Sequence, residues 1–309
     1  MIRAAHSDTA SGLTLIATAA IAWGTIPLVL EATGNVHPVI AVFYRVGISA
    51  LVLLVVAPFT GTYRELKSMS RQNWLGLATN GVLLAVNWVL FFLGLRLAGV
   101  AIGEILGYTG PVWVAVLLPL LLNERFDHRV VLPLALALSG TIAVLLATVG
   151  HESGSSMLPG ALLAFASSLT YAMLILNAKR LLRGVGAVTL MLVEDVVAAT
   201  LLSPALLFLA GPATAREWGA LATLAIVLTV GTGFLFLSGL KRVRADHGAI
   251  LTYAEPVSAV IFGAIFLGQH LTFLVGLGGA LVVTGGVIVA RMGPTPAIEV
   301  PSLITDAIE

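Results

Sequence analysis

The stretch Gly103-Glu-Ile-Leu-Gly-Tyr108-Thr-Gly-Pro111-Val112 occurs a second time, 145 residues later, as Gly248-Ala-Ile-Leu-Thr-Tyr253-Ala-Glu-Pro256-Val257. The same shift carries Gly94-Leu95-Arg96 onto Gly239-Leu240-Lys241. Helix-breaking residues therefore stand in matching places along an unbroken register. Such a register indicates an internal duplication of the chain.

The composition is that of an integral membrane protein. Of the 309 residues, 59% are hydrophobic and only 10% are charged, and the mean hydropathy is +1.04. A soluble domain carries about 25% charged residues, so this surface is suited to a lipid bilayer. The chain has no Cys, which excludes disulfides and thiolate metal sites. With a net charge of +1, we expect no nucleic-acid partner. We also expect neither a cofactor nor a metal.

Ten segments meet or approach the ~20 apolar residues that a membrane-spanning helix needs. They divide the chain into a tail (1–12), a first repeat (13–149), a loop (150–157), a second repeat (158–291) and a second tail (292–309). The predicted spans are Leu13–Leu30, Val39–Ala57, Trp74–Leu95, Ala101–Leu122, Val130–Val149, Leu158–Asn177, Ala187–Ala210, Trp218–Leu240, His247–Leu267 and Thr272–Ala290.

Basic residues predict the orientation. With a cytoplasmic N-terminus, thirteen Lys and Arg residues fall in inner segments and two, Arg96 and Arg216, in outer ones. This positive-inside bias places both termini in the cytoplasm. Because five spans per repeat is an odd number, the second repeat enters the membrane from the opposite side. The predicted fold is all-α: ten transmembrane helices arranged as two inverted five-helix repeats.

Six short motifs lie in or at the ends of the predicted spans: Ala22-Trp23-Gly24, Tyr44-Arg45, Tyr108-Thr-Gly-Pro111, Asn123-Glu124-Arg125, Tyr253-Ala-Glu-Pro256 and Gly268-Gln269. With these motifs and its ten spans, the chain resembles the EamA-type branch of the drug/metabolite transporter superfamily over nearly its whole length. The aromatic amino-acid exporters of this superfamily are similar in size and layout. Members often carry an acid at the ends of both the fourth and ninth spans, whereas here the second is Gln269.

The resemblance implies helices around a central cavity that opens to one side at a time, with the fifth and tenth spans behind it. Small residues in these two spans allow helix backbones to approach closely, so we predict that they serve packing. They are Ala135, Ala137, Ser139 and Gly140 in the fifth span and Gly276, Gly278, Gly279, Gly285 and Gly286 in the tenth.

Ionisable residues inside spans are costly, so each one indicates a partner, a cavity or a function. In one interpretation Arg45 binds a substrate carboxylate, and an acid opposite it receives an amine or a proton. In the other, charges pair between helices and only fix their packing. The candidate acids are Glu104, Glu194, Asp195 and Glu255.

Each copy of the repeated stretch pairs a tyrosine with a proline. Pro111 and Pro256 each remove a backbone hydrogen bond and are expected to kink their helices. The freed carbonyls and the hydroxyls of Tyr108 and Tyr253 need water, substrate or a neighbour. We therefore predict that both tyrosines bind substrate, with a kink used only for packing as the alternative.

Further mid-span residues complete the predicted site. Trp23, Trp88 and Tyr171 carry ring N–H or O–H groups that need a partner when buried. The amide of Asn87 is expensive inside a span unless it forms hydrogen bonds. We predict that all four line the substrate site, although such tryptophans are often simply packed or exposed to lipid.

Together these patterns favour a secondary carrier that exports small metabolites, amino acids in particular, across a bacterial inner membrane by alternating access. Its partners would be the substrate and the bilayer, and it would be a monomer or a weak homo-oligomer. A passive channel is the main alternative. An enzyme is disfavoured, because all six His residues lie in loops, tails or span ends. The chain also contains no Gly-x-x-x-x-Gly-Lys-Ser/Thr loop for ATP.

Overall fold

The computed structural model describes residues 2–34, 36–148, 156–268 and 272–292, and these residues are helical almost throughout. The loop and second tail predicted at 150–157 and 292–309 lie largely outside this part of the chain, as does Gln269. The helices are α1 (Ile2–Trp23), α2 (Ile26–Glu31), α3 (Pro38–Thr60), α4 (Thr62–Ser68), α5 (Arg71–Ala98), α6 (Val100–Gly107), α7 (Gly110–Leu122), η1 (His128–Val130), α8 (Val131–Thr148), α9 (Met157–Leu181), α10 (Ala187–Leu202), η2 (Ser203–Leu207), α11 (Ala215–Ala225), η3 (Ile226–Gly231), α12 (Thr232–Arg242), α13 (Ala245–Leu251), α14 (Ala254–Leu267) and α15 (Phe273–Arg291).

Ten helical stretches within the described residues are long and apolar enough to cross a membrane, which confirms the predicted set of spans. Several of them are interrupted. The first span joins α1 to α2, the fourth joins α6 to α7, and the ninth joins α13 to α14. The helix α1 already begins at Ile2, inside the segment predicted to be a tail.

The contacts of the first half are repeated in the second half with the roles exchanged. Helix α5 of the first half packs against α9 of the second, and α12 of the second packs against α1 of the first. In the same way α7 packs against α9, and α14 packs against α1. This exchange is the pattern that two intertwined inverted repeats produce.

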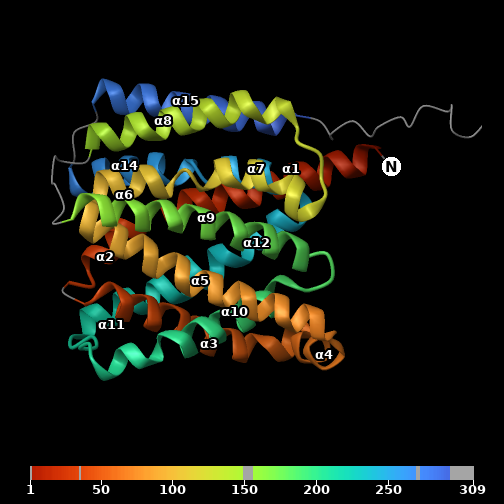
Figure 1. Ribbon diagram of the computed structural model, residues 1–309, viewed down its shortest axis with the longest axis vertical. Helices are drawn as coiled ribbons and strands as arrows, with labels where there is room; N and C mark the ends of the chain where they lie inside the picture. The colour runs from red at the N-terminus through yellow and green to blue at the C-terminus, as the bar shows by residue number, and fades with distance from the viewer. Residues whose placement is uncertain (1, 35, 149–155, 269–271, 293–309) are drawn as a thin grey trace, which may run out of the picture.

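The fifth and tenth spans form a layer of their own. Figure 1 shows α8 and α15 side by side along one edge of the bundle, with α3 and α11 along the opposite edge. Small residues allow the close approach of α8 and α15. A Cβ added at Gly278 would lie 2.9 Å from Cγ2 and 3.1 Å from the backbone N of Val144. The packing role predicted for the small residues of these two spans is therefore confirmed.

The repeated stretch breaks its helix in both copies. The first copy is interrupted at Tyr108 and Thr109, between α6 and α7, and the second at Thr252 and Tyr253, between α13 and α14. In each case the break precedes the proline, whose missing N–H releases a carbonyl in the preceding turn. The predicted kinks are thus full interruptions.

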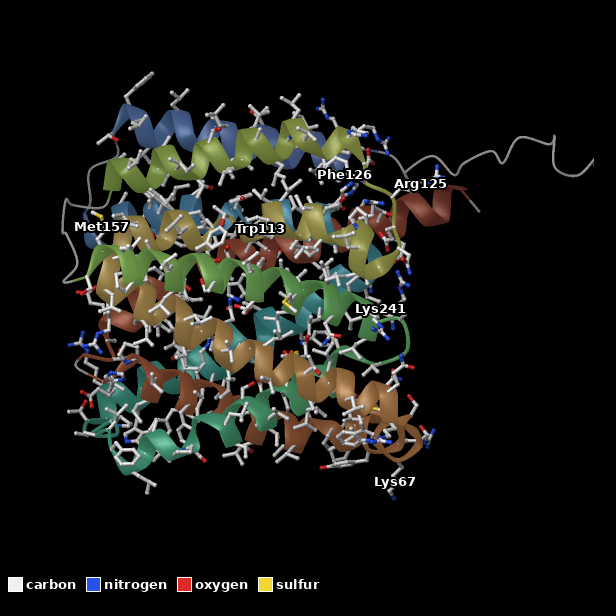
Figure 2. The ribbon with its side chains drawn as sticks, viewed as in Figure 1. Lys67, Trp113, Arg125, Phe126, Met157 and Lys241 are labelled. Atoms are coloured by element: carbon white, nitrogen blue, oxygen red, sulfur yellow. The ribbon has the colours of Figure 1, made fainter. Side chains whose placement is uncertain are left out.

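The two ends of the bundle differ in charge. In Figure 2, Lys67, Arg125 and Lys241 are spread along one end of the bundle, and Met157 lies at the other. We call the first the basic end. The N-terminus is also at this end (Figure 1).

Candidate functional site

Arg45 of α3 contacts residues of both halves of the chain. Its guanidinium carbon lies 4.4 Å from the centroid of the Trp88 ring on α5. Its Nε donates to Oγ1 of Thr229 at 2.6 Å, and one terminal nitrogen donates to the carbonyl of Leu228 at 2.9 Å. Stacking and two hydrogen bonds fix the plane of the guanidinium, and the remaining N–H groups stay available to a ligand.

The anchor for Arg45 is a π-helical segment, η3. Its wider turn is seen at Thr229, whose hydroxyl bonds the carbonyl of Leu224, five residues earlier, at 2.8 Å. Single π-helical turns inside α-helices are frequent at functional sites. Here the segment turns Thr229 and the carbonyl of Leu228 toward a helix of the other half.

The acids predicted beside Arg45 are held by neutral partners. Asp195 is buried and accepts a hydrogen bond from Ser49. Glu194 accepts one from Nδ2 of Asn80 at 2.6 Å. Within the described part of the chain, no ion pair joins Arg45 to either acid, although Asp195 lies close enough to Arg45 to interact with it electrostatically.

Three other polar side chains lie close to one another in this region. Glu104 on α6, Glu255 on α14 and Tyr108 between α6 and α7 are each partly exposed. Between described residues, no hydrogen bond to the two carboxylates or to the Tyr108 hydroxyl is found. Glu255 lies close enough to Arg45, Glu104 and Tyr108 to act on them electrostatically. Because an unpartnered carboxylate is expensive away from water, these groups are candidates for contact with a ligand or with water.

The two tyrosines of the repeated stretch have different environments. Tyr253 is fully buried, and its hydroxyl donates to the carbonyl of Tyr108 at 2.8 Å. The carbonyl freed at the break in the first copy therefore has the tyrosine of the second copy as its neighbour. Their ring centroids are 6.4 Å apart. In this conformation Tyr108 is available to a ligand and Tyr253 is not.

Of the remaining predicted residues, Trp88 and Tyr171 lie near Arg45 and Glu255, and Trp23 and Asn87 form hydrogen bonds between helices. Tyr171 is electrostatically coupled to Glu255, and its hydroxyl lies 3.5 Å from that of Thr252. Trp23 donates to Oγ1 of Thr232 at 2.7 Å. Asn87 donates to the Ser167 carbonyl at 2.6 Å and is buried.

The sequence analysis missed several partners of these residues. Asn80 joins three helices, because its Nδ2 bonds Glu194 while its Oδ1 accepts from Asn177 at 3.0 Å. Asn80 and Asn177 are both amides inside spans, so the cost of burying an amide, which identified Asn87, would have identified them as well. Thr229 carries no comparable signal, since hydroxyls are common in spans. Within the described residues, no group of three or more His, Asp or Glu could hold a metal ion.

Comparison with known proteins gives the family. The profile of the EamA-like transporter family matches residues 10–146 and again residues 158–291. An uncharacterized transporter of Bacillus subtilis, YetK, is 29% identical over 60% of this chain and 58% of its own length. The match to a second uncharacterized transporter of Bacillus subtilis, YcbK, spans only 23% of that protein. The pseudopaline exporter CntI of Pseudomonas aeruginosa is 25% identical over 90% of this chain and 93% of its own length.

A solved structure entitled "Crystal structure of protein" has the same fold. It superimposes with a TM-score of 0.78 and covers 91% of this chain and 99% of its own, at 21% identity. The duplicated match of the family profile covers both halves of the chain described above. The chain therefore belongs to the EamA-like transporter family and has the helices of a multi-pass membrane protein.

Proposed function

We propose that this transporter is a secondary carrier that exports small metabolites, neutral amino acids and aromatic ones in particular, by alternating access. The observation that carries the proposal is the charge arrangement around Arg45. One oriented guanidinium and the carboxylate of Glu255 lie close enough to act on each other electrostatically, and no hydrogen bond to that carboxylate is found between described residues. An amino acid carries the complementary groups, a carboxylate for Arg45 and an ammonium for Glu255.

Aromatic surface supports this class of substrate. Trp88 lies under Arg45, while the rings of Tyr108 and Tyr171 are partly exposed near Glu255. Such rings provide flat apolar area for a side chain and a polar edge for hydrogen bonds. The name of CntI, an exporter that matches along most of its length, agrees with outward transport.

The proposed location is a bacterial inner membrane with the basic end in the cytoplasm. Lys67, Arg125 and Lys241 lie at that end (Figure 2), and the positive-inside bias assigns such an end to the cytoplasm. The chain has no Cys, so a single introduced thiol reports orientation. In intact cells, a membrane-impermeant maleimide should label Met157→Cys and leave Lys67→Cys unlabelled.

Counterflow in proteoliposomes tests the transport mechanism. Vesicles loaded with unlabelled phenylalanine should transiently accumulate radiolabelled phenylalanine from outside, and the initial rate should saturate with concentration. A rate that rises linearly without counterflow would indicate a channel. If no member of a panel of neutral amino acids is transported, the proposed substrate class is wrong. Repeating the assay with an imposed pH gradient shows whether a proton moves with the substrate.

A further inference from the structure

The two copies of the repeated stretch differ in burial although their sequences match. In α13, at the basic end, every residue from Ala245 to Ile250 is buried. In α6, at the opposite end, only Gly103 is buried among residues 102–107. Ile250 is 2% exposed, whereas its counterpart Ile105 is partly exposed. The bundle is therefore closed around α13 at the basic end, whereas α6 is less covered by other helices.

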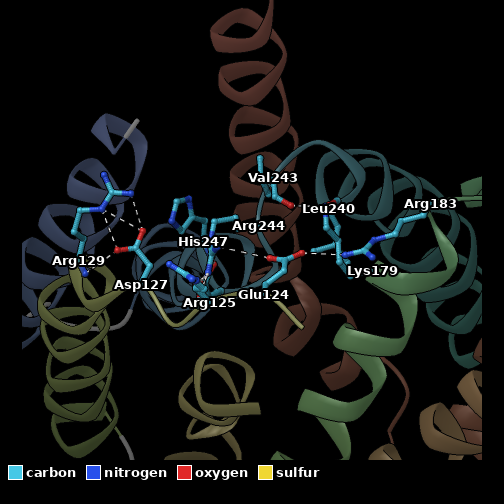
Figure 3. A network of polar contacts seen from close by, with 11 residues as sticks. Glu124, Arg125, Asp127, Arg129, Lys179, Arg183, Leu240, Val243, Arg244 and His247 are labelled. Atoms are coloured by element: carbon cyan, nitrogen blue, oxygen red, sulfur yellow. Dashed lines mark hydrogen bonds and ion pairs between the residues drawn. The ribbon is translucent and has the colours of Figure 1, made fainter. Parts of the chain in front are cut away.

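Glu124, which follows α7, connects the two halves at the closed end (Figure 3). One carboxylate oxygen lies 3.1 Å from the guanidinium of Arg183, beyond the end of α9. The other lies 3.7 Å from Arg244, between α12 and α13. Arg244 also donates to the carbonyl of Arg125 at 3.2 Å. A first-half loop is thereby tied to two separate parts of the second half.

A second carboxylate holds the guanidinium of Arg244 in position beside Glu124. Arg244 donates to both oxygens of Asp246, at 3.1 and 2.9 Å, and Asp246 is almost fully buried. Burial lowers the pKa of Arg244, but Asp246 and Glu124 more than offset this, so its pKa lies above the usual value. The side chains of Glu124 and Arg244 are 25% and 18% exposed, and partly buried pairs are screened less by salt than surface pairs.

Ionic contacts are concentrated at this end of the protein. Lys179 donates to the carbonyls of Leu240 and Val243, at 2.7 and 2.5 Å, and so holds the end of α12 (Figure 3). All ion pairs found between described residues lie at the basic end. Toward the opposite end, the polar contacts across the halves between described residues include hydrogen bonds between uncharged groups, such as Ser156 N to the Leu97 carbonyl at 3.1 Å and Asn87 to the Ser167 carbonyl at 2.6 Å.

We propose that Glu124 is a gating residue, which holds the basic end closed through Arg183 and Arg244, and that the structure is the state open toward the opposite end. The inference rests on the alternating access proposed above. Opening the basic end requires α13 to leave its buried position, and this separates Arg244 from Glu124. Removing the charge of Glu124 therefore favours the state open at the basic end.

The absence of native Cys makes accessibility the natural measurement. Ile105→Cys and Ile250→Cys place one reporter thiol at each of the two equivalent positions, in the purified full chain. In the otherwise native background, a small maleimide should label Ile105→Cys faster. Adding Glu124→Gln should raise the labelling rate of Ile250→Cys about tenfold and lower that of Ile105→Cys, as expected for losing a partly buried network contact.

Two companion variants identify the cause of any change. Lys67→Gln removes an exposed charge at the same end and should leave both rates unchanged. Glu124→Asp keeps the charge on a shorter side chain and should give intermediate rates. If Glu124→Gln leaves both rates unchanged, or raises both together as general loosening would, the gating role is overturned. Reciprocal changes support it even if the transport assay excludes amino acids, so the two proposals fail separately.

Discussion

Replacing Tyr253 by Phe removes one hydroxyl at the point where the two copies of the repeated stretch meet. The hydroxyl is buried and donates to the carbonyl of Tyr108 at 2.8 Å. Phe keeps the ring, so the loss is one interhelical hydrogen bond and a carbonyl left without that donor. Such losses cost about 1 kcal/mol in membrane proteins, roughly a fivefold change in the unfolding equilibrium constant.

Tyr108→Phe is the matched control, because it removes the equivalent hydroxyl from the other copy. This hydroxyl has no hydrogen-bond partner among the described residues, so the free energy of unfolding should change by less than about 0.5 kcal/mol. Transport should respond in the opposite order, with a higher KM for Tyr108→Phe. Unfolding in mixed micelles and counterflow would measure the two effects. Equal losses of stability in both variants, or none in Tyr253→Phe, would refute the reasoning.

Three further predictions concern packing and the site. Gly278→Ala should destabilise the protein by about 1–3 kcal/mol in a thermal unfolding assay, because its Cβ would lie 2.9 Å from Cγ2 of Val144. Gly276→Ala is the control: its Cβ meets nothing within 4 Å, so it should be neutral or slightly stabilising in the same assay. Arg45→Lys keeps the charge but loses the planar stack on Trp88, so the KM for exchange should rise about tenfold while membrane insertion stays normal; an unchanged KM would remove Arg45 from the site. Asn80→Ala breaks its bonds to two other helices and should lower the free energy of unfolding by about 1 kcal/mol, which mixed-micelle unfolding would detect.

The sequence predicted the fold well because its signals are long and redundant. Spans are set by runs of ~20 apolar residues, and the 145-residue register fixed the division into halves independently of hydropathy. Small residues in the fifth and tenth spans predicted their close packing, which the contacts at Gly278 confirm. Where the helices break was less predictable, because a proline locates an interruption only to within about one turn.

The site was predicted only as a set of residue types at membrane depth. Burial cost identifies Arg45, Glu104 and Glu255 as unusual, but it does not say which of them have partners. Arg45 binds a π-helical segment and forms no ion pair with Asp195. Both outcomes depend on how two distant spans are rotated about their axes. The sequence also did not predict that Tyr253 is buried and hydrogen-bonded while Tyr108 is partly exposed, because the two similar stretches do not indicate which end of the bundle is closed.

The π-helical segment makes the link between the second and eighth spans depend on one residue. Its wider turns hold one residue more than an α-helix would over the same rise, and they leave the carbonyl of Leu228 to Arg45. Deleting one residue between Ile226 and Gly231 would allow regular α-helical winding while α12 keeps its orientation, so the indole of Trp23 would still reach Thr232. The carbonyl of Leu228 would then accept a hydrogen bond within its own helix, and Arg45 would lose it. A single codon lost there would uncouple the second span from the eighth, whereas a conservative exchange at the same place would not.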